Sequence, residues 1–255
     1  MKIALLGDIH ANLPALEATL RHARQNGIDA VWNAGDSIGY GAFPNEVISV
    51  LRREKVTSII GNYDVKILNS DGKMPGDSRK PGGLDQTGAM QWTYASLSQD
   101  NLSYLRSLPE NIRMMAGDKR VLLIHGSPDS CTERLDLWTP WQRFAKIAES
   151  AEADIIISGH SHQPMVKMHG NVWFVNTGSV GRPDDGDPRA CYAILEIAGP
   201  IIVRHYRVRY DVDRAATAIR RNRLPEEYAQ MIAVGRSLEY VTNARRIALY
   251  ENNCA

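Results

Sequence analysis

The sequence has little cysteine, almost no net charge and no long apolar run. Its three cysteines, Cys131, Cys191 and Cys254, are far apart and odd in number, and they form no CxxC pair. This argues against a disulfide framework or a cysteine metal cluster and fits a reducing cytoplasm. Lys and Arg number 30 against 29 Asp and Glu, which gives a formal net charge of +1. Composition therefore indicates neither a stable nucleic-acid partner nor an anionic membrane.

The apolar stretches are all short. The N-terminal segment MKIALLGDIH is too brief for a signal peptide and contains an aspartate. No stretch approaches the roughly 18 apolar residues of a membrane span. We therefore expect a cytoplasmic protein without membrane association, whose 255 residues form one large domain or two small ones.

Strand and helix signals alternate along the first 64 residues. The predicted order is strand, helix, strand, helix, strand, with boundaries near 2–6, 13–27, 28–33, 44–54 and 56–60. Asn12 precedes the first helix as an N-cap. This βαβαβ order predicts a parallel sheet with right-handed crossovers.

The remaining two thirds of the chain mixes helices, hairpins and a tail. Residues 69–90 are rich in Gly, Pro and polar side chains, and we expect a surface loop there, either an ordinary one or a lid. The predicted helices are 86–97, 99–107 and 140–150, and the predicted strands are 111–115, 120–124, 154–158, 164–168, 172–175, 190–197 and 201–209. We expect a core over 1–210 and a helical C-terminal extension over 211–255, packed on the core, with a new segment at Pro225.

Five short stretches stand where apolar strands end, and each carries a good metal ligand. They are Asp8-Ile9-His10, Gly35-Asp36, Gly61-Asn62-Tyr63-Asp64, His125-Gly126 and Gly159-His160-Ser161-His162. Any one of them alone is more often a turn or an N-cap, but all five in order favour a shared site at the carboxyl edge of the sheet. Imidazole with carboxylate and amide oxygens suits Mn, Fe, Zn or Ni better than Mg or Ca. Two such ions about 3.5–4 Å apart clamp a phosphoryl group and generate hydroxide at neutral pH.

This pattern resembles the calcineurin-like metallophosphoesterase family over residues 1 to about 182, and Gly178 to Pro183 is similar to its small bacterial and archaeal phosphodiesterase-like branch. The resemblance implies a mixed α/β fold, a four-layer αββα sandwich of two mixed β-sheets flanked by helices, here followed by a helical tail. It also implies two divalent transition-metal ions, manganese first, with iron, zinc or nickel as alternatives. The ligands carried over are Asp8, His10 and His162 for one ion, Asn62, His125 and His160 for the other, and Asp36 between them.

Charge explains an asparagine among these ligands. Two divalent ions carry four positive charges, Asp8 and Asp36 remove two, and a hydroxide removes a third, so about one positive charge remains for an anionic substrate. Asn62 supplies an oxygen without cancelling that charge. We expect Asp64 to orient a histidine ligand or its neighbours rather than to bind metal.

Tyr63 departs from the family, where this position often holds a histidine thought to protonate the leaving oxygen. A phenol with a reference pKa of about 10 is a poorer acid at pH 7, so Tyr63 either hydrogen-bonds a phosphoryl oxygen or only shapes the pocket.

Arg182 follows a glycine-rich turn and is either a phosphate contact or a surface arginine. Residues 128–140 are expected to line the cleft, Ser161 has no evident base, and structural or solvated roles are expected for His22, His169 and His205.

The sequence thus predicts a dinuclear metallophosphoesterase that hydrolyses small phosphodiesters or nucleotide phosphoesters by attack of a metal-bridging hydroxide. The catalytic residues in this hypothesis are Asp36, Asn62, Tyr63 and Asp64. A protein Ser/Thr phosphatase or a dinucleoside polyphosphate hydrolase would use the same metal core. A non-catalytic binding or scaffold protein of the same fold is the alternative from another class, and the presence of all seven ligands argues against it. The natural substrate and the oligomeric state do not follow from the sequence.

Overall fold

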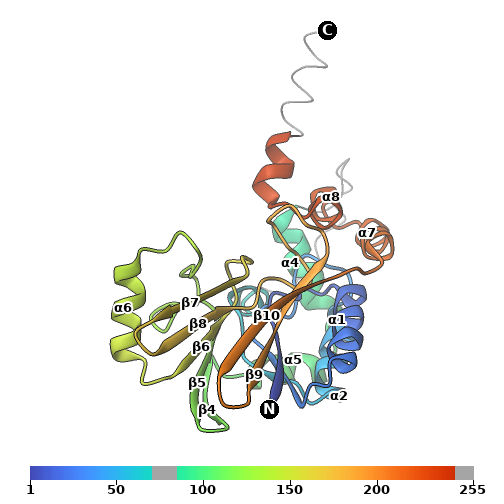
Figure 1. Ribbon diagram of the computed structural model, residues 1–255. Coiled ribbons are helices and arrows are strands. Elements are labelled where there is room, and N and C mark those ends of the chain that lie inside the picture. Colours follow the sequence, from blue (N-terminus) through green and yellow to red (C-terminus); the bar gives the residue numbers. More distant parts are fainter. Residues whose placement is uncertain (71–84, 245–255) are drawn as a thin grey trace.

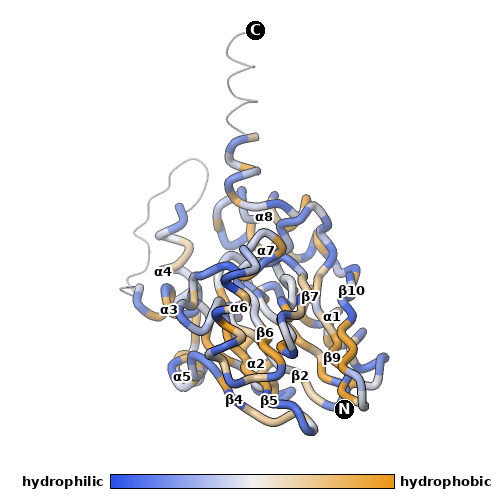
Figure 2. The backbone as a smooth tube through the Cα atoms, turned by 60° about the vertical axis from the view of Figure 1, so that its left-hand side comes forward, coloured by the Kyte–Doolittle hydropathy of each residue, from blue (hydrophilic) through white to orange (hydrophobic). Residues whose placement is uncertain are grey.

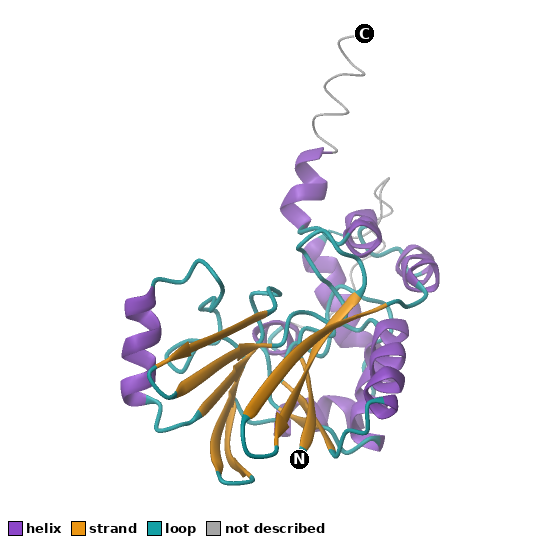
Figure 3. Cartoon of the chain, viewed as in Figure 1, coloured by secondary structure: helices purple, strands orange, loops and turns teal. Residues whose placement is uncertain are grey.

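The computed structural model describes residues 1–70 and 85–244. Two five-stranded mixed sheets lie face to face, and helices cover the outer face of each, as Figures 1 and 3 show. The predicted four-layer αββα sandwich is therefore confirmed.

The first sheet has the strand order β10-β9-β1-β2-β3. Its strands are β1 (Lys2–Leu6), β2 (Ala30–Asn33), β3 (Thr57–Ser58), β9 (Ala190–Ile197) and β10 (Ile201–Val208). β1 pairs in parallel with β2, and β2 with β3, while β9 runs antiparallel to β1 and to β10. The parallel sheet predicted for the first 64 residues is confirmed, and the late hairpin extends it at the β1 edge.

The second sheet has the strand order β4-β5-β6-β8-β7. Its strands are β4 (Asn111–Ala116), β5 (Lys119–Ile124), β6 (Ile155–Ser158), β7 (Met165–His169) and β8 (Val172–Asn176). β5, β6 and β8 are parallel, with β4 and β7 antiparallel at the two edges. The carboxyl ends of β1, β2, β5 and β6 thus carry the loops that hold the predicted ligands.

Alternation along the strands builds the two sides of the sandwich. In β1, Ile3 and Leu5 enter the apolar layer between the sheets, whereas Ala4 and Leu6 pack under the helices. The outer layers are formed by α1 (Leu13–Gln25), α2 (Pro44–Arg53) and α5 (Gln99–Ser107) on one sheet, and by α6 (Trp141–Ser150) on the other. The hydropathy colouring in Figure 2 places the apolar segments along the central strands.

Sequence patterns missed one helix and overestimated one strand. Residues 56–60 were expected to be a strand, but only Thr57–Ser58 pair with β2, and α3 (Asn62–Leu68) starts directly at GNYD. The Asp64 side chain accepts a hydrogen bond from the Gly61 N–H and so caps this short helix. Most of the loop expected at 69–90 lies outside the described residues, and α4 (Gln86–Ser96) occupies its end.

The tail contributes α7 (Val212–Arg221) and α8 (Glu226–Val234), with Pro225 directly before α8, and residues 238–244 are helical as well. They lie at the end of the molecule opposite the N-terminus, beside α4 (Figure 1). Their apolar side chains form a separate cluster with Ala89 of α4. The boundary between residues 210 and 211 stays a prediction. In the described part of the chain, no helix is long and apolar enough to cross a membrane.

Candidate metal centre

The seven predicted ligands meet at one edge of the sandwich. Asp8 and His10 follow β1, Asp36 follows β2, His125 ends β5, His160 and His162 follow β6, and Asn62 starts α3. Six of them are buried, with exposed fractions between 0% and 6%, and His160 is partly buried. Side chains from both sheets therefore share one water-poor site.

Three side chains form a first group of ligand atoms. The Nε2 atoms of His10 and His162 lie 3.3 Å apart. Asp8 Oδ1 lies 3.3 Å from His162 Nε2 and 4.0 Å from His10 Nε2. These three residues fulfil the geometric requirement for a shared cation.

A second group surrounds the Asn62 amide. Its Oδ1 lies 2.8 Å from His125 Nε2 and 2.9 Å from His160 Nδ1. The centroids of the two imidazole rings are 5.2 Å apart with an interplanar angle of 67°. The arrangement brings one amide oxygen and two imidazole nitrogens to a common point.

Asp36 faces both groups. Its Oδ2 lies 3.8 Å from His10 Nε2 and 3.5 Å from His125 Nε2. Its other oxygen, Oδ1, accepts a hydrogen bond of 2.7 Å from the Tyr63 backbone N–H, which fixes the rotation of the carboxylate. One oxygen is thus held by the backbone, and the other is turned to the space between the groups.

The hydrogen bonds of three histidines indicate that cations belong here. His10, His125 and His162 each place Nδ1 against a backbone carbonyl, those of Ile38 (3.3 Å), Ala34 (2.7 Å) and Arg182 (2.7 Å). A carbonyl only accepts, so Nδ1 carries a proton in each ring, and in the neutral rings of His10 and His162 the Nε2 atom offers a lone pair. The lone pairs of His10 and His162 face each other, His125 Nε2 lies against Asn62 Oδ1, and buried Asp8 Oδ1 has no hydrogen-bond partner. Acceptors facing acceptors fit cations between them.

Burial and mutual charge set the protonation of the centre. Burial lowers the pKa of His10 and of His162 to about 3, which leaves both as neutral imidazoles. Burial opposes charge on His125 as well, but the carboxylates of Asp36 and Asp8 outweigh it and raise the pKa of His125 to about 10. Burial raises the pKa of Asp8, and His125 holds the pKa of Asp36 low despite burial. Metal binding at His125 has to release a proton, so affinity should rise with pH.

The backbone at the ligands is strained. Five of the seven ligand residues have positive φ, namely Asp8 (52°), His10 (49°), Asp36 (53°), His160 (63°) and His162 (59°). Non-glycine residues rarely adopt this region, and such strain concentrates at functional sites. Neither composition nor periodicity signals these conformations.

Gly61 lets two ligand loops touch. A Cβ at this position would lie 2.1 Å from the Asp36 N and 2.2 Å from its Oδ1, so any side chain would displace the carboxylate. Asp64 ties the same loops together, because its buried carboxylate accepts the N–H groups of Ser37 (3.2 Å), Ile38 (3.0 Å) and Gly61 (3.0 Å). Asp64 therefore ties the backbone that follows Asp36 to Gly61, the residue that precedes Asn62.

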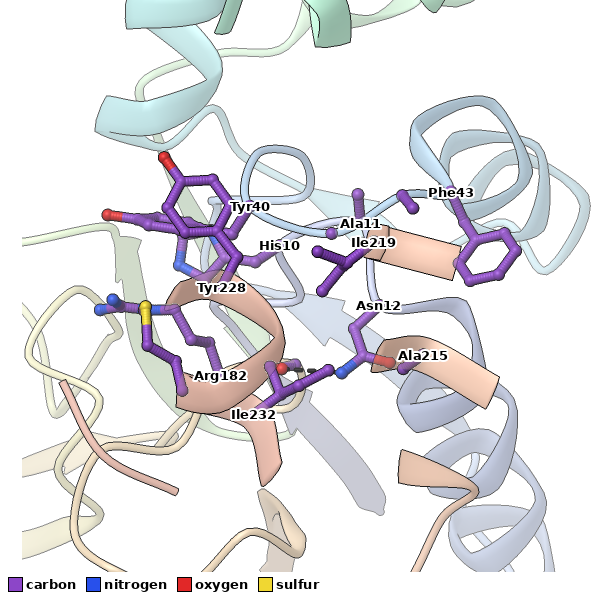
Figure 4. A pocket seen from close by; sticks show the side chains of 14 residues that line it. His10, Ala11, Asn12, Tyr40, Phe43, Arg182, Ala215, Ile219, Tyr228 and Ile232 are labelled. Atoms are coloured by element: carbon purple, nitrogen blue, oxygen red, sulfur yellow. Dashed lines mark hydrogen bonds between the residues drawn. The ribbon is translucent and has the colours of Figure 1, made fainter. Parts of the chain in front are cut away.

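A tyrosine cluster that no sequence pattern indicates lies beside the first group of ligand atoms. The Tyr40 hydroxyl donates to the Tyr63 hydroxyl, and the Tyr40 ring lies 5.0 Å from His10 and 4.8 Å from Tyr228 of α8. Figure 4 shows Tyr40, Tyr228 and Arg182 gathered around His10. The tail therefore reaches the wall of the centre, although no local pattern connects Tyr228 with residues near the N-terminus.

The remaining histidines have structural contacts elsewhere. His22 Nδ1 lies 2.7 Å from the Tyr192 hydroxyl, His205 Nε2 lies 2.7 Å from the Asn176 carbonyl, and the His169 ring stacks on Trp141. Ser161 is fully buried and donates to the Leu135 carbonyl. In the segment 128–140, Pro128 to Cys131 line a pocket of about 260 Å³ that also borders His125.

Known proteins match the chain over most of its length. The family described as calcineurin-like phosphoesterase superfamily domain matches residues 1–199. An uncharacterized protein of Methanocaldococcus jannaschii is 33% identical over 252 residues, covering 92% of this chain and 98% of that protein. Phosphodiesterase YfcE of Escherichia coli is 23% identical over 196 residues, covering 77% and 88%. The crystal structure of a metallophosphoesterase from Sphaerobacter thermophilus aligns with a TM-score of 0.76 at 32% identity, covering 92% of this chain and 99% of that one.

Proposed function

The chain belongs to the calcineurin-like phosphoesterase superfamily, and from this premise we propose that it is a dinuclear metal-dependent hydrolase of phosphodiesters or nucleotide phosphoesters. The proposed substrate is a small molecule, and the proposed compartment is the cytoplasm. YfcE, a relative over 77% of the chain, carries the name phosphodiesterase, which supports this choice of substrate class.

The observation that carries the proposal is the position of Asp36 Oδ2 between two groups of ligand atoms. It faces His10 Nε2 of the first group at 3.8 Å and His125 Nε2 of the second at 3.5 Å. A single carboxylate oxygen in contact with two ligand sets is what a pair of metal ions about 3.5–4 Å apart requires. We assign Asp8, His10 and His162 to one ion, Asn62, His125 and His160 to the other, and Asp36 to both.

Bound ions would supply Lewis acidity, which activates water and neutralises the phosphoryl oxygens. The chain itself fixes where this happens. The backbone carbonyls of Ile38, Ala34 and Arg182 set the tautomer of three histidines, and the Tyr63 N–H sets the rotation of Asp36. Asp64 holds the two loops that carry Asp36 and Asn62. Because these groups are already in place, the site does not have to rearrange when charge develops on the substrate.

The test is a metal-controlled hydrolysis screen. Protein stripped with a chelator and reloaded with Mn²⁺ is assayed on an aryl phosphomonoester, an aryl phosphodiester, nucleotides, a dinucleoside polyphosphate and a phosphopeptide, with Asp36→Asn as the inactive control. We expect hydrolysis of the diester or of a nucleotide that disappears on stripping and returns with metal.

Other outcomes assign the site differently. Preference for the phosphopeptide would indicate a protein phosphatase, and preference for a dinucleoside polyphosphate the corresponding hydrolase. Two bound ions without hydrolysis of any phosphoester would contradict the proposal and favour a binding or scaffold role.

A further inference from the structure

The turn that precedes Arg182 is locked onto the ligand loops. The N–H groups of Val180 and Gly181 donate to the Gly7 and Asp8 carbonyls at 3.0 Å, and the Ser179 hydroxyl donates to Asp8 at 2.8 Å. A Cβ at Gly181 would lie 1.8 Å from the Ile9 carbonyl oxygen, so only glycine allows this approach. The backbone of Arg182 is therefore held in a fixed position relative to the loop that carries Asp8.

The Arg182 side chain lies beside the first group of ligands without an anionic partner. Its guanidinium lies 4.5 Å over the Tyr40 ring, and one Nη2 lies 3.3 Å from His162 Nδ1, a nitrogen whose proton already goes to the Arg182 carbonyl. Its Nε is buried and has no hydrogen-bond partner. Within residues 1–70 and 85–244, no carboxylate forms an ion pair with it.

An unpaired, partly buried cation next to a metal site is costly unless a ligand completes it. Arginine's planar fork of N–H donors matches phosphoryl oxygens. We propose that Arg182 binds a nonbridging oxygen of the substrate's phosphoryl group, and that Tyr40 and Tyr228 hold its guanidinium in place. The inference rests on the proposed function and specifies one of its substrate contacts.

The tail takes part in this contact. Tyr228 of α8 is 3% exposed and packs against the Tyr40 ring, which in turn carries the guanidinium. In Figure 4 the guanidinium and the hydroxyls of Tyr40 and Tyr228 lie on the same side of the cluster, away from Ala215 and Ile219 of α7. The C-terminal helices thus support the substrate-binding wall, beyond the residues 1–199 that the family match covers.

A cation beside the phosphoryl group discriminates by charge. A phosphomonoester or terminal phosphate carries nearly two negative charges at pH 7, whereas an internal diester carries one. The attraction to Arg182 should therefore be larger for a dianionic phosphoryl group. This makes the ratio of the two activities a readout that a merely structural arginine would not change.

The experiment compares Arg182→Gln and Arg182→Lys with wild type, all loaded with Mn²⁺. Arg209→Gln is the matched control, because Arg209 is exposed and makes none of the site contacts. Binding of inorganic phosphate is measured by calorimetry, metal content by elemental analysis, and kcat/KM on an aryl phosphomonoester and an aryl phosphodiester.

For Arg182→Gln with full metal content, we expect phosphate affinity to fall by roughly 10- to 100-fold, the range for hydrogen bonds to charged groups. The loss in kcat/KM should be larger for the monoester than for the diester. Arg182→Lys, a point charge without the fork, should recover part of the phosphate affinity. Arg209→Gln should match wild type.

Tyr228→Ala and Tyr228→Phe test the support. Removing the ring should weaken phosphate binding in the same direction, whereas Phe, which keeps the ring packing, should retain it. Unchanged phosphate affinity in Arg182→Gln, or equal losses on monoester and diester that Arg182→Lys does not relieve, would overturn the inference. Absence of hydrolysis by wild type would overturn the proposed function instead, since the phosphate measurement does not depend on turnover.

Discussion

The Nε2 atoms of His10 and His162 face each other across 3.3 Å, although each ring places Nδ1 against a backbone carbonyl. Burial lowers the pKa of both imidazoles to about 3, so neither ring carries an extra proton to share at neutral pH. Two lone pairs pointed at one another inside the protein are unfavourable unless a cation lies between them. The adjacent Asp8 Oδ1 is buried without a hydrogen-bond partner, and it too would be satisfied by a cation at this position.

Metal content is the first prediction. Protein reconstituted with Mn²⁺ should hold about two ions per chain, and its thermal midpoint should rise, because ions that bind only the folded state stabilise it by mass action. Elemental analysis and thermal unfolding with and without chelator measure both. His162→Ala should lose an ion, whereas His169→Ala, which removes a ring stacked on Trp141, should keep both. A content of one ion or fewer in wild type would contradict the dinuclear site.

Substitutions of Asp36 and Asp64 should have different effects on metal content and turnover. Asp36→Asn removes the carboxylate that faces both ligand groups and should lower both metal content and turnover. Asp64→Asn leaves the ligands in place and keeps an oxygen for the backbone N–H groups, so turnover should fall by only roughly 10–100-fold. Steady-state kinetics with metal analysis compare the two. Near wild-type turnover with two ions bound in Asp36→Asn would show that the assignment of Asp36 is wrong.

Glu133 provides a pH prediction outside the metal centre. The Arg143 guanidinium donates to both Glu133 oxygens at 2.6 Å and holds the pKa of that carboxyl below its usual 4.5. A depressed folded-state pKa contributes stability above the unfolded value, and this stability is lost as pH falls through the folded pKa. Glu133→Gln should therefore reduce the free energy of unfolding by about 1 kcal/mol at pH 7 and by less below pH 4.

Urea unfolding of the metal-free proteins at both pH values measures this difference, since bound metal would add its own pH dependence. Glu17→Gln, which breaks a more exposed pair with Arg214, is the control and should change stability little. A Glu133→Gln effect of the same size at both pH values would mean that the side chain matters through packing rather than through charge.

Local patterns in the sequence predicted most elements of the fold. The predicted strands and most helices agree with the structure because apolar periodicity follows directly from which face of each element is buried. The sequence patterns did not indicate helix α3 because it has only seven residues, follows a glycine N-cap and depends on the Asp64 side chain to cap its first turn. β3 proved short because its chain leaves the sheet after Ser58 to form the Gly61 approach to Asp36.

The candidate site also has features that the sequence indicates and features that it does not. The candidate ligands and their order at strand ends were visible in the sequence, since each follows an apolar run. Tyr40, Tyr228 and the free Nε of Arg182 were not, because their roles depend on contacts between residues up to 188 positions apart. The positive φ angles at five ligands were also invisible, since tertiary contacts impose them against local preference.

The last prediction concerns Tyr63, which lies next to Asn62 with its ring 5.6 Å from His10. Its hydroxyl accepts a hydrogen bond from Tyr40, and burial together with Tyr40 raises the pKa of Tyr63 above its ordinary value. Such a phenol is a weak proton donor at pH 7. General-acid help is worth roughly 10²–10⁴-fold and matters most when the leaving alkoxide is basic. The rate should therefore depend steeply on leaving-group pKa.

Tyr63→His would introduce an imidazole that can donate a proton, so it should raise activity on alkyl phosphoesters and barely change it on nitrophenyl ones. The measurement is kcat/KM over a series of phosphoesters graded by leaving-group pKa, with metal content checked in each protein. Tyr240→His, at a tyrosine that is 55% exposed, is the control and should leave the slope unchanged. An equal change along the whole series would assign Tyr63 to shaping the pocket. A shallow slope in wild type would mean that another group already delivers the proton. The same series of substrates would then be measured on Asp64→Asn.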